Sequence, residues 1–323
     1  MSQAKVPPML DPELKPFLDT WTKSWAVLPE NATPKERRLL FEYIAEKMRL
    51  PAPAGITLDT RFVPSEGRNV LVRIERHGDG GTQPCLVYMH GGAWMQGSPM
   101  THADITSRIA AANRQTVVSI DYALAPEHVF PKAVHEVMDV VRWVRTHAAD
   151  LGIDPARIAI GGDSAGANLA AAACIGLRGS ADLPMAQLLV YPCVHFEMSF
   201  PSYVENANAP LLQVAGMPRV NAMYCPDKTK WTDPLVAPLH AASHAGLPQA
   251  FIAVAENDPL RDDGYAYADR LREAGVSVEF DPGKGLIHGY LRAMEHCTAS
   301  REKLKRMGDW LAACYAAGVG SHA

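Results

Sequence analysis

A serine between glycines, Ser164, is the residue of this sequence best suited to nucleophilic chemistry. It lies in Gly162-Asp163-Ser164-Ala165-Gly166, between the apolar run RIAIGG and the alanine-rich stretch ANLAAAACIGL. This G-x-S-x-G pattern is typical of a strand that turns sharply into a helix and holds the serine hydroxyl above a sheet. The N-terminus of the following helix favours negative charge at that point. We therefore predict that Ser164 is a nucleophile.

A serine hydroxyl becomes reactive when a base accepts its proton and a carboxylate orients that base. On scaffolds with this serine motif the acid and then the histidine follow the serine along the chain. His288 lies among glycines in GKGLIHGY, and Asp258 is the first carboxylate after the apolar run AFIAVAE. Asp262 and Asp263 come where a helix should begin, which is typical of capping residues. We predict that Asp258 and His288 complete a triad with Ser164.

A second glycine-rich stretch, HGGAW, ends the apolar run CLVYM. Attack on an acyl carbon places negative charge on the former carbonyl oxygen, and preorganised N–H groups stabilise that charge. Glycine lets a backbone approach closely and aim its N–H groups. We predict donors at Gly91, Gly92 and Ala165, with Ala93 left open as a further donor. We expect His90 to brace this loop rather than to act as a base.

The elements that must position these residues form an alternating series. Apolar runs (CLVYMH, TVVSIDY, RIAIGG, QLLVYP, AFIAVAE and then VSVEF) are each followed by a helical stretch. This order predicts an α/β fold with a mostly parallel sheet and helices on both faces. Before them, ITLDTRFV and NVLVRIER alternate apolar and polar residues and predict a hairpin. Ligands of such sheets bind outside the carboxyl ends of the strands, where the predicted triad lies.

Two further regions are expected to cover that edge of the sheet. Residues 1–50 hold helix-start signals at Asp11 and Thr33 and are predicted to form N-terminal cap helices. Residues 194–248 are rich in proline and aromatic side chains, without a long strand pattern, and are predicted to form a cap insertion. The catalytic core then comprises residues 51–193 and 249–323. Trp94 and Met95, directly after the glycine-rich loop, are predicted pocket residues.

The composition indicates a soluble globular enzyme. Of 323 residues, 48% are hydrophobic and 20% are charged, and the net charge is −4. The sequence has no basic block for nucleic acid and no apolar run long enough to span a membrane. The N-terminus has no secretory pattern, and six scattered cysteines suggest free buried thiols in a reducing cytoplasm. No metal or cofactor motif is present, so we expect none, and a homodimer remains possible.

Taken together, these motifs resemble the hormone-sensitive-lipase family of α/β-hydrolases, which includes bacterial esterases. The resemblance implies a carboxylic-ester hydrolase with a helical cap and implies Asp258 as the triad acid. Five blocks of the sequence match the family, and they follow one another along the chain in the family's order. The five matching blocks are His90–Trp94, Asp121–Pro131, Gly162–Gly166, Asp258–Asp262 and Ile287–Gly289.

The sequence departs from this family pattern at two positions. Ala93 stands where the family usually has a third glycine. Its N–H can still serve the oxyanion if φ is negative, and its methyl group is expected to narrow the acyl side of the pocket. Ala123 replaces a usual arginine, which removes an ion pair without affecting the chemistry.

Three functions fit these residues to different degrees. The first is a serine carboxylesterase that acts on short- to medium-chain acyl esters through an acyl-enzyme, with a small-molecule ester as its partner. The alternative is an amide or aryl-formamide hydrolase on the same scaffold, because kynurenine formamidases also have a non-glycine residue in the HGG-x-W loop. A binding protein, as in the plant gibberellin receptors, is disfavoured because those proteins lack the triad histidine. A long-chain lipase is disfavoured because no interfacial apolar surface is indicated.

Overall fold

The computed structural model describes residues 9–29, 31–78 and 80–319. Residues 1–8 and 320–323, at the ends of the predicted cap and core, lie outside the described residues. Within the described ranges, eight strands form one sheet in the order β1-β2-β4-β3-β5-β6-β7-β8. The strands are β1 (Ile56–Ser65), β2 (Arg68–His77), β3 (Gln83–Met89), β4 (Thr116–Ile120), β5 (Ile153–Asp163), β6 (Ala186–Val190), β7 (Gln249–Ala253) and β8 (Val278–Asp281).

The sheet confirms the predicted α/β-hydrolase topology. Strands β1 and β2 form the expected antiparallel hairpin, and β2 also pairs antiparallel with β4. The remaining neighbours, from β4 through β3 to β8, pair in parallel. Their carboxyl ends therefore meet at one edge, and the loops that leave β3, β5, β7 and β8 lie together there.

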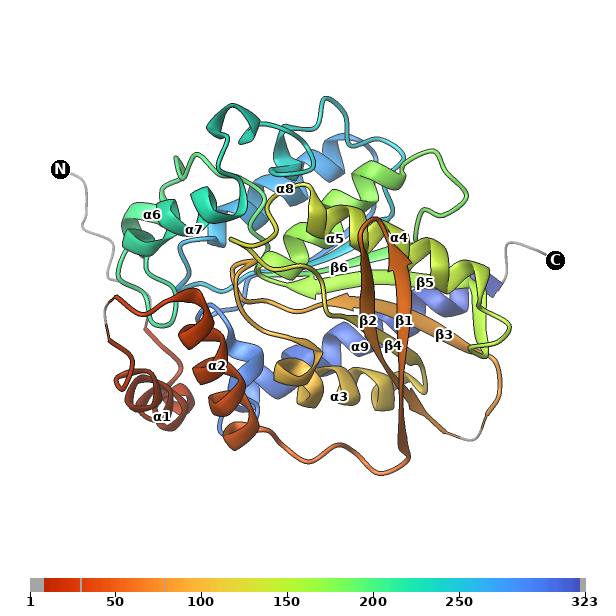
Figure 1. The fold of residues 1–323 in the computed structure, drawn as a ribbon, viewed down its shortest axis with the longest axis horizontal. Helices are drawn as coiled ribbons and strands as arrows, with labels where there is room; N and C mark the ends of the chain where they lie inside the picture. The colour runs from red at the N-terminus through yellow and green to blue at the C-terminus, as the bar shows by residue number, and fades with distance from the viewer. Residues whose placement is uncertain (1–8, 30, 79, 320–323) are drawn as a thin grey trace.

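Helices cover both faces of the sheet (Figure 1). The side chains of β3 show why, because Cys85, Val87 and Met89 join one apolar core while Leu86 and Tyr88 join the other. Such alternation places successive side chains on opposite faces. The first core packs against α4 (Lys132–Thr146), α5 (Ala165–Leu177) and α8 (Arg261–Glu273), and the second against α3 (Ala103–Asn113) and α9 (Thr298–Val319).

The N-terminal segment forms the short 3-10 helix η1 (Pro12–Leu14), then α1 (Lys15–Trp25) and α2 (Pro34–Met48). Both predicted starts are confirmed: Asp11 accepts from the N–H of Glu13, and Thr33 forms a capping box with Glu36. Helix α2 is fixed to the sheet edge by one side chain. Arg38 donates to the carbonyl oxygens of Met95 and Ala125, each at 2.7 Å. The N-terminal helices are therefore tied to the loop that follows β3.

The segment between β6 and β7 contains short helices and no strand, as predicted. It holds α6 (Ser202–Glu205) and α7 (Met217–Tyr224), which lie at the same end of the molecule as α1 and α2 (Figure 1). The other short 3-10 helices are η2 (Pro99–His102), η3 (Val214–Gly216), η4 (Lys228–Lys230), η5 (Pro238–His240) and η6 (Tyr290–Ala293). Among the described residues, no helix has the length and apolar character that a bilayer crossing requires. All six cysteines are free and buried.

Candidate active site

Ser164 occupies the sharp turn between β5 and α5. Its backbone has φ 55° and ψ −120°. Residues other than glycine rarely adopt this conformation, and it marks strain at functional turns. Glycine is required on both sides of the serine for a steric reason. A Cβ atom at Gly162 or Gly166 would collide with the carbonyl oxygen of Met89. The turn therefore presses against the end of β3, and only glycine fits on either side of the serine.

The structure brings the three predicted triad residues together. The His288 Nε2 atom lies 2.9 Å from Ser164 Oγ, and the His288 Nδ1 atom lies 2.7 Å from Asp258 Oδ2. Asp258 is fully buried, and its other oxygen accepts from the N–H of Leu260 at 2.8 Å. With Nδ1–H donating to the carboxylate, Nε2 presents a lone pair to the serine hydroxyl. The arrangement can therefore remove the proton of Ser164.

A backbone bridge aligns the acid and the base. Asn257 pairs with Ile287 in an isolated parallel bridge, so the residues after them, Asp258 and His288, emerge side by side. The backbone N–H of Asn257 donates to Leu286 O at 2.9 Å, and its side chain contacts the same oxygen at 3.3 Å. Our sequence analysis did not identify Asn257, because its partner lies in a loop that only the fold brings near.

The predicted oxyanion donors differ in whether their N–H groups are available. Among the residues that the structure describes, no acceptor contacts the N–H groups of Gly92, Ala93 or Ala165. The prediction for Gly91 is wrong, because its N–H donates to Asp163 Oδ1 at 3.0 Å and is not free for a substrate. This bond instead fixes the start of the loop against the residue that precedes Ser164.

The backbone at Ala93 does not have the conformation on which its predicted role depended. The sequence made the oxyanion role of Ala93 conditional on a negative φ, and this condition is not met, because φ is +56° at Ala93 and +137° at Gly92. Ala93 thus adopts the left-handed conformation that glycine accommodates without strain and that costs other residues roughly 1–2 kcal/mol. Ala93 therefore has the backbone conformation expected of a glycine. Its N–H has no hydrogen-bond partner in the described part of the chain.

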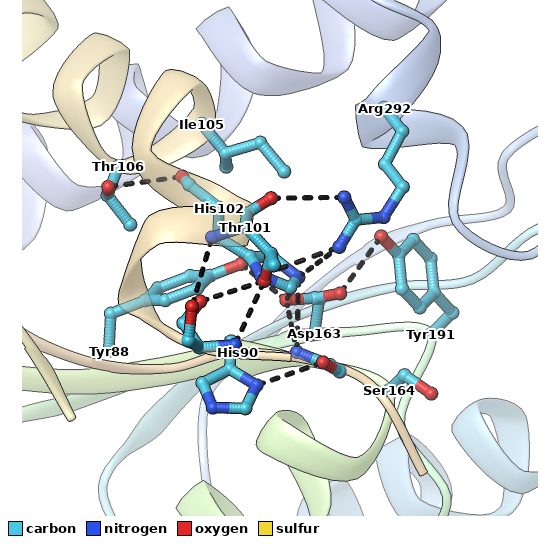
Figure 2. Close-up of polar contacts among 12 residues, drawn as sticks. Tyr88, His90, Thr101, His102, Ile105, Thr106, Asp163, Ser164, Tyr191 and Arg292 are labelled. Carbon is cyan, nitrogen blue, oxygen red and sulfur yellow. Dashed lines mark hydrogen bonds and ion pairs between the residues drawn. The ribbon is translucent and has the colours of Figure 1, made fainter. Parts of the chain in front are cut away.

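A buried polar network surrounds Asp163 (Figure 2). Its carboxylate accepts from the Tyr88 hydroxyl at 2.8 Å and lies 3.3 Å from His102 Nε2. The Tyr191 hydroxyl lies 3.5 Å from its second oxygen. Burial alone raises the pKa of Asp163, but the neighbouring His102, Arg292 and Tyr88 side chains outweigh it, so the pKa lies below its ordinary value. An ionised carboxylate therefore stabilises the turn directly beside the serine.

His90 has the bracing surroundings that we predicted. Its ring is buried and stacks on Tyr122 with ring centroids 4.3 Å apart, and the Tyr122 hydroxyl donates to His90 O at 2.8 Å. Burial lowers the pKa of His90 to about 3. A neutral ring packed in this way supports the loop.

A cavity of about 390 Å³ opens over the serine. Ser164, Trp94 and Met95 all line it, together with residues of α2 and of the segment around α7. The Trp94 ring stacks on Tyr224 at 4.5 Å, and its Nε1–H points to Asn168 Oδ1 at 3.3 Å. Residues of both segments that we predicted to form a cap therefore line the cavity.

The prediction that Asp262 and Asp263 cap a helix is wrong. The residue before α8 is Leu260, which makes no side-chain cap. Asp263 is fully buried and accepts from the backbone N–H groups of Val194 and His195 at 3.0 and 3.1 Å. Asp262 accepts from the N–H of Ser202 at 2.9 Å. Both carboxylates therefore hold the segment after β6, a long-range role that sequence spacing does not reveal.

One cluster outside the cavity has the donor types of a metal site. Glu197 Oε2 lies 2.8 Å from His195 Nε2 and 3.4 Å from His240 Nε2. Two imidazoles and a carboxylate are common transition-metal ligands. The same contacts also satisfy the carboxylate without an ion.

A family described by the α/β hydrolase fold matches residues 86–292, more than half of the chain. The chain therefore belongs to this family. Its resemblance to the hormone-sensitive-lipase group, which includes carboxylesterases, is confirmed by its relatives.

Several relatives are named as ester hydrolases. Carboxylesterase NlhH of Mycobacterium tuberculosis is 42% identical over 212 residues, and the match covers 64% of this chain and 66% of NlhH, just under two thirds. An arylesterase of Saccharolobus solfataricus is 34% identical over 87% of this chain and 92% of its own length. The solved structure of a hyperthermophilic esterase from the archaeon Pyrobaculum calidifontis superposes with a TM-score of 0.86 at 32% identity. It covers 94% of this chain and 98% of that one.

Proposed function

We propose that this chain is a serine carboxylesterase that hydrolyses short- to medium-chain acyl esters. The observation that carries the proposal is the continuous contact from Asp258 through His288 to Ser164, at 2.7 and 2.9 Å. Ala93 and Ala165 line the adjoining cavity, and their N–H groups, like that of Gly92, have no protein acceptor among the described residues. Two of its relatives are named as a carboxylesterase and an arylesterase, which supports the same chemistry.

In the proposed reaction, His288 Nε2 takes the proton of Ser164 as its oxygen attacks the ester carbonyl. The negative oxygen of the tetrahedral intermediate is held by the N–H groups of Gly92, Ala93 and Ala165, each worth about 2.7–4 kcal/mol when lost. The proton then passes to the leaving alcohol. Water repeats the sequence on the acyl-enzyme, and Asp258 stabilises the imidazolium at each stage.

We assign the roof of the pocket to the two predicted cap segments, residues 1–50 and 194–248. A cavity of about 390 Å³ lies within the range of small-ligand pockets, which supports a short or medium acyl chain. The chain lengths accepted then depend on the side chains of α2 and of the segment around α7.

The decisive test compares wild type with Ser164→Ala on p-nitrophenyl acetate, butyrate, octanoate and an aryl formamide. We expect butyrate hydrolysis to disappear in the variant while circular dichroism and melting temperature remain those of wild type. A fluorophosphonate probe should label wild type and not the variant. Near-normal butyrate turnover by Ser164→Ala would overturn the proposal, and a higher kcat/KM on the formamide would assign the alternative amide chemistry.

A further inference from the structure

We propose that the pocket beside Ser164 binds esters that carry a free carboxylate, and that Arg37 and Arg219 hold this second group. The inference rests on the proposed function, because the same pocket supplies the nucleophile. Arg37 lies on α2 and Arg219 on α7, so the two predicted cap segments each contribute one guanidinium to the cavity wall.

Two arginines line the cavity, and no acid in the described part of the chain lines it beside them. Within residues 9–29, 31–78 and 80–319, the charged lining residues are Arg37 and Arg219, without an aspartate or glutamate. Within residues 9–29, 31–78 and 80–319, neither guanidinium contacts a carboxylate or a carbonyl oxygen. The next residue of α2 is the opposite case, since Arg38 pairs with Glu127 at 2.6 Å.

Arg37 is also held in place before any ligand binds. Its guanidinium carbon lies 5.1 Å from the centre of the Trp25 ring, a cation–π arrangement. Arg38, one residue on, fixes α2 through the carbonyl oxygens of Met95 and Ala125. An oriented guanidinium loses little freedom when it binds a carboxylate, and its planar fork matches two carboxylate oxygens.

The two arginines lie close enough to repel each other. Burial and then the charge of Arg219 lower the pKa of Arg37 from its ordinary value. Both side chains remain charged at neutral pH, since a guanidinium is not deprotonated in proteins. An anion between them relieves the repulsion as well as making new hydrogen bonds, so the pair favours a negatively charged ligand.

The rest of the pocket defines the other end of such a substrate. Leu212, Met217, Val220 and Leu260 line it and suit a hydrocarbon segment. The net charge of the chain is −4, so the two arginines do not belong to a generally basic surface. An apolar spacer between an ester and a carboxylate fits both features. Half-esters of dicarboxylic acids and acyl esters of hydroxy acids have this structure.

The experiment uses two pairs of esters with the same shape and different charge. Monoethyl glutarate and ethyl isoheptanoate differ on the acyl side, where a carboxylate replaces an isopropyl group. The acetate ester of γ-hydroxybutyrate and isohexyl acetate differ in the same way on the alcohol side. The quantity measured is the ratio of kcat/KM for the anionic ester to that for its neutral partner, and the pair with the larger ratio identifies the side that faces the arginines.

We expect Arg219→Met and Arg37→Met each to lower that ratio by about 10-fold or more, with Arg219→Lys between wild type and Arg219→Met. Arg219 is exposed on α7, so its replacement tests the inference even if Arg37→Met folds poorly. Arg270→Met, at an exposed arginine of α8 away from the cavity, is the matched control and should leave the ratio unchanged. Added salt should lower the wild-type ratio.

The two levels of the proposal fail differently. Hydrolysis of the neutral esters with a ratio that no pocket variant changes would overturn the role of the arginines and leave the esterase intact. No hydrolysis of any of the four esters, together with no fluorophosphonate labelling of Ser164, would overturn the esterase proposal itself.

Discussion

The Arg292 Nη2 atom lies 2.7 Å from His102 Nε2, and Arg292 Nη1 donates to Thr101 O at 3.1 Å. Arg292 belongs to the loop that carries His288, whereas His102 follows the glycine-rich loop after β3. The contact therefore joins the two loops close to the Asp163 carboxylate (Figure 2).

Replacing Arg292 with methionine should separate these loops without removing a reacting group. We expect kcat on p-nitrophenyl butyrate to fall about 10-fold with little change in KM, and the free energy of unfolding to fall by about 2 kcal/mol. Steady-state kinetics and guanidinium denaturation measure both effects. Arg272→Met, on the exposed side of α8, should behave as wild type. Unchanged kcat in a destabilised Arg292→Met would show that the residue serves the fold alone.

Exchanging Asp258 for asparagine should identify the acid. The amide cannot hold the imidazole in the same tautomer, so we expect kcat to fall by about ten-thousand-fold. Asp262→Asn is the matched control, because Asp262 contacts the backbone of Ser202 and not His288. Its kcat should stay near wild type. Comparable losses in the two variants would mean that the contact between Asp258 and His288 does not govern the rate.

Ala93→Gly should relieve the left-handed backbone at this position and remove one methyl group from the pocket wall. The relief of strain offsets the greater freedom of glycine in the unfolded chain, so we expect the melting temperature not to fall. The acyl preference should move toward longer or branched chains. A series of p-nitrophenyl esters measures this preference, and an identical profile for the two proteins would remove Ala93 as a determinant of specificity.

Acid should destabilise the protein partly through His90. Its pKa is about 3 in the fold against an ordinary value of 6.5, so below pH 6.5 the unfolded chain binds a proton that the folded chain does not. Stability is therefore lost as the pH falls from about 6.5 toward about 3, at up to roughly 1.4 kcal/mol per pH unit for one proton.

Denaturation at several pH values tests this origin. His90→Asn should lower stability overall but show a shallower dependence on pH than wild type, whereas His135→Asn, exposed on α4, should keep the wild-type slope. Burial also lowers the pKa values of His195 and His244, so some slope should remain in every variant. Equal slopes in wild type and His90→Asn would mean that His90 is protonated in the folded protein.

The sequence was sufficient to predict the sheet and the proximity of Ser164, Asp258 and His288, for physical reasons. Each core strand is a short apolar run followed by a helical stretch, which leaves few topologies. The steric demands of the turn around Ser164 impose glycines at fixed spacing, and the order of Asp258 and His288 follows from the order of the strands. These features are local, or depend only on strand order, so residue types record them.

Contacts between distant segments were not predictable in this way. We predicted that the N–H of Gly91 is free because no residue near it in the sequence indicates a partner. Its acceptor, Asp163, lies more than seventy residues later. Asp263 looked like a helix cap for the same reason, although its carboxylate binds the backbone after β6. The φ of Ala93 followed the shape of the loop rather than the preference of the residue. In each case tertiary geometry overrode the local pattern.

The bridge between Asn257 and Ile287 connects the backbone beside Asp258 and His288 but does not reach Ser164. It links the loop after β7 that carries Asp258 to the loop after β8 that carries His288, while Ser164 follows β5, and β6 stands between β5 and β7. The 2.9 Å contact between His288 and Ser164 thus connects the linked loops to the turn after β5. The 2.7 Å contact between His288 and Asp258 lies within the linked loops. On warming, the contact between His288 and Ser164 should be lost first. Catalysis should then stop while Asp258 and His288 are still paired and the sheet is still folded.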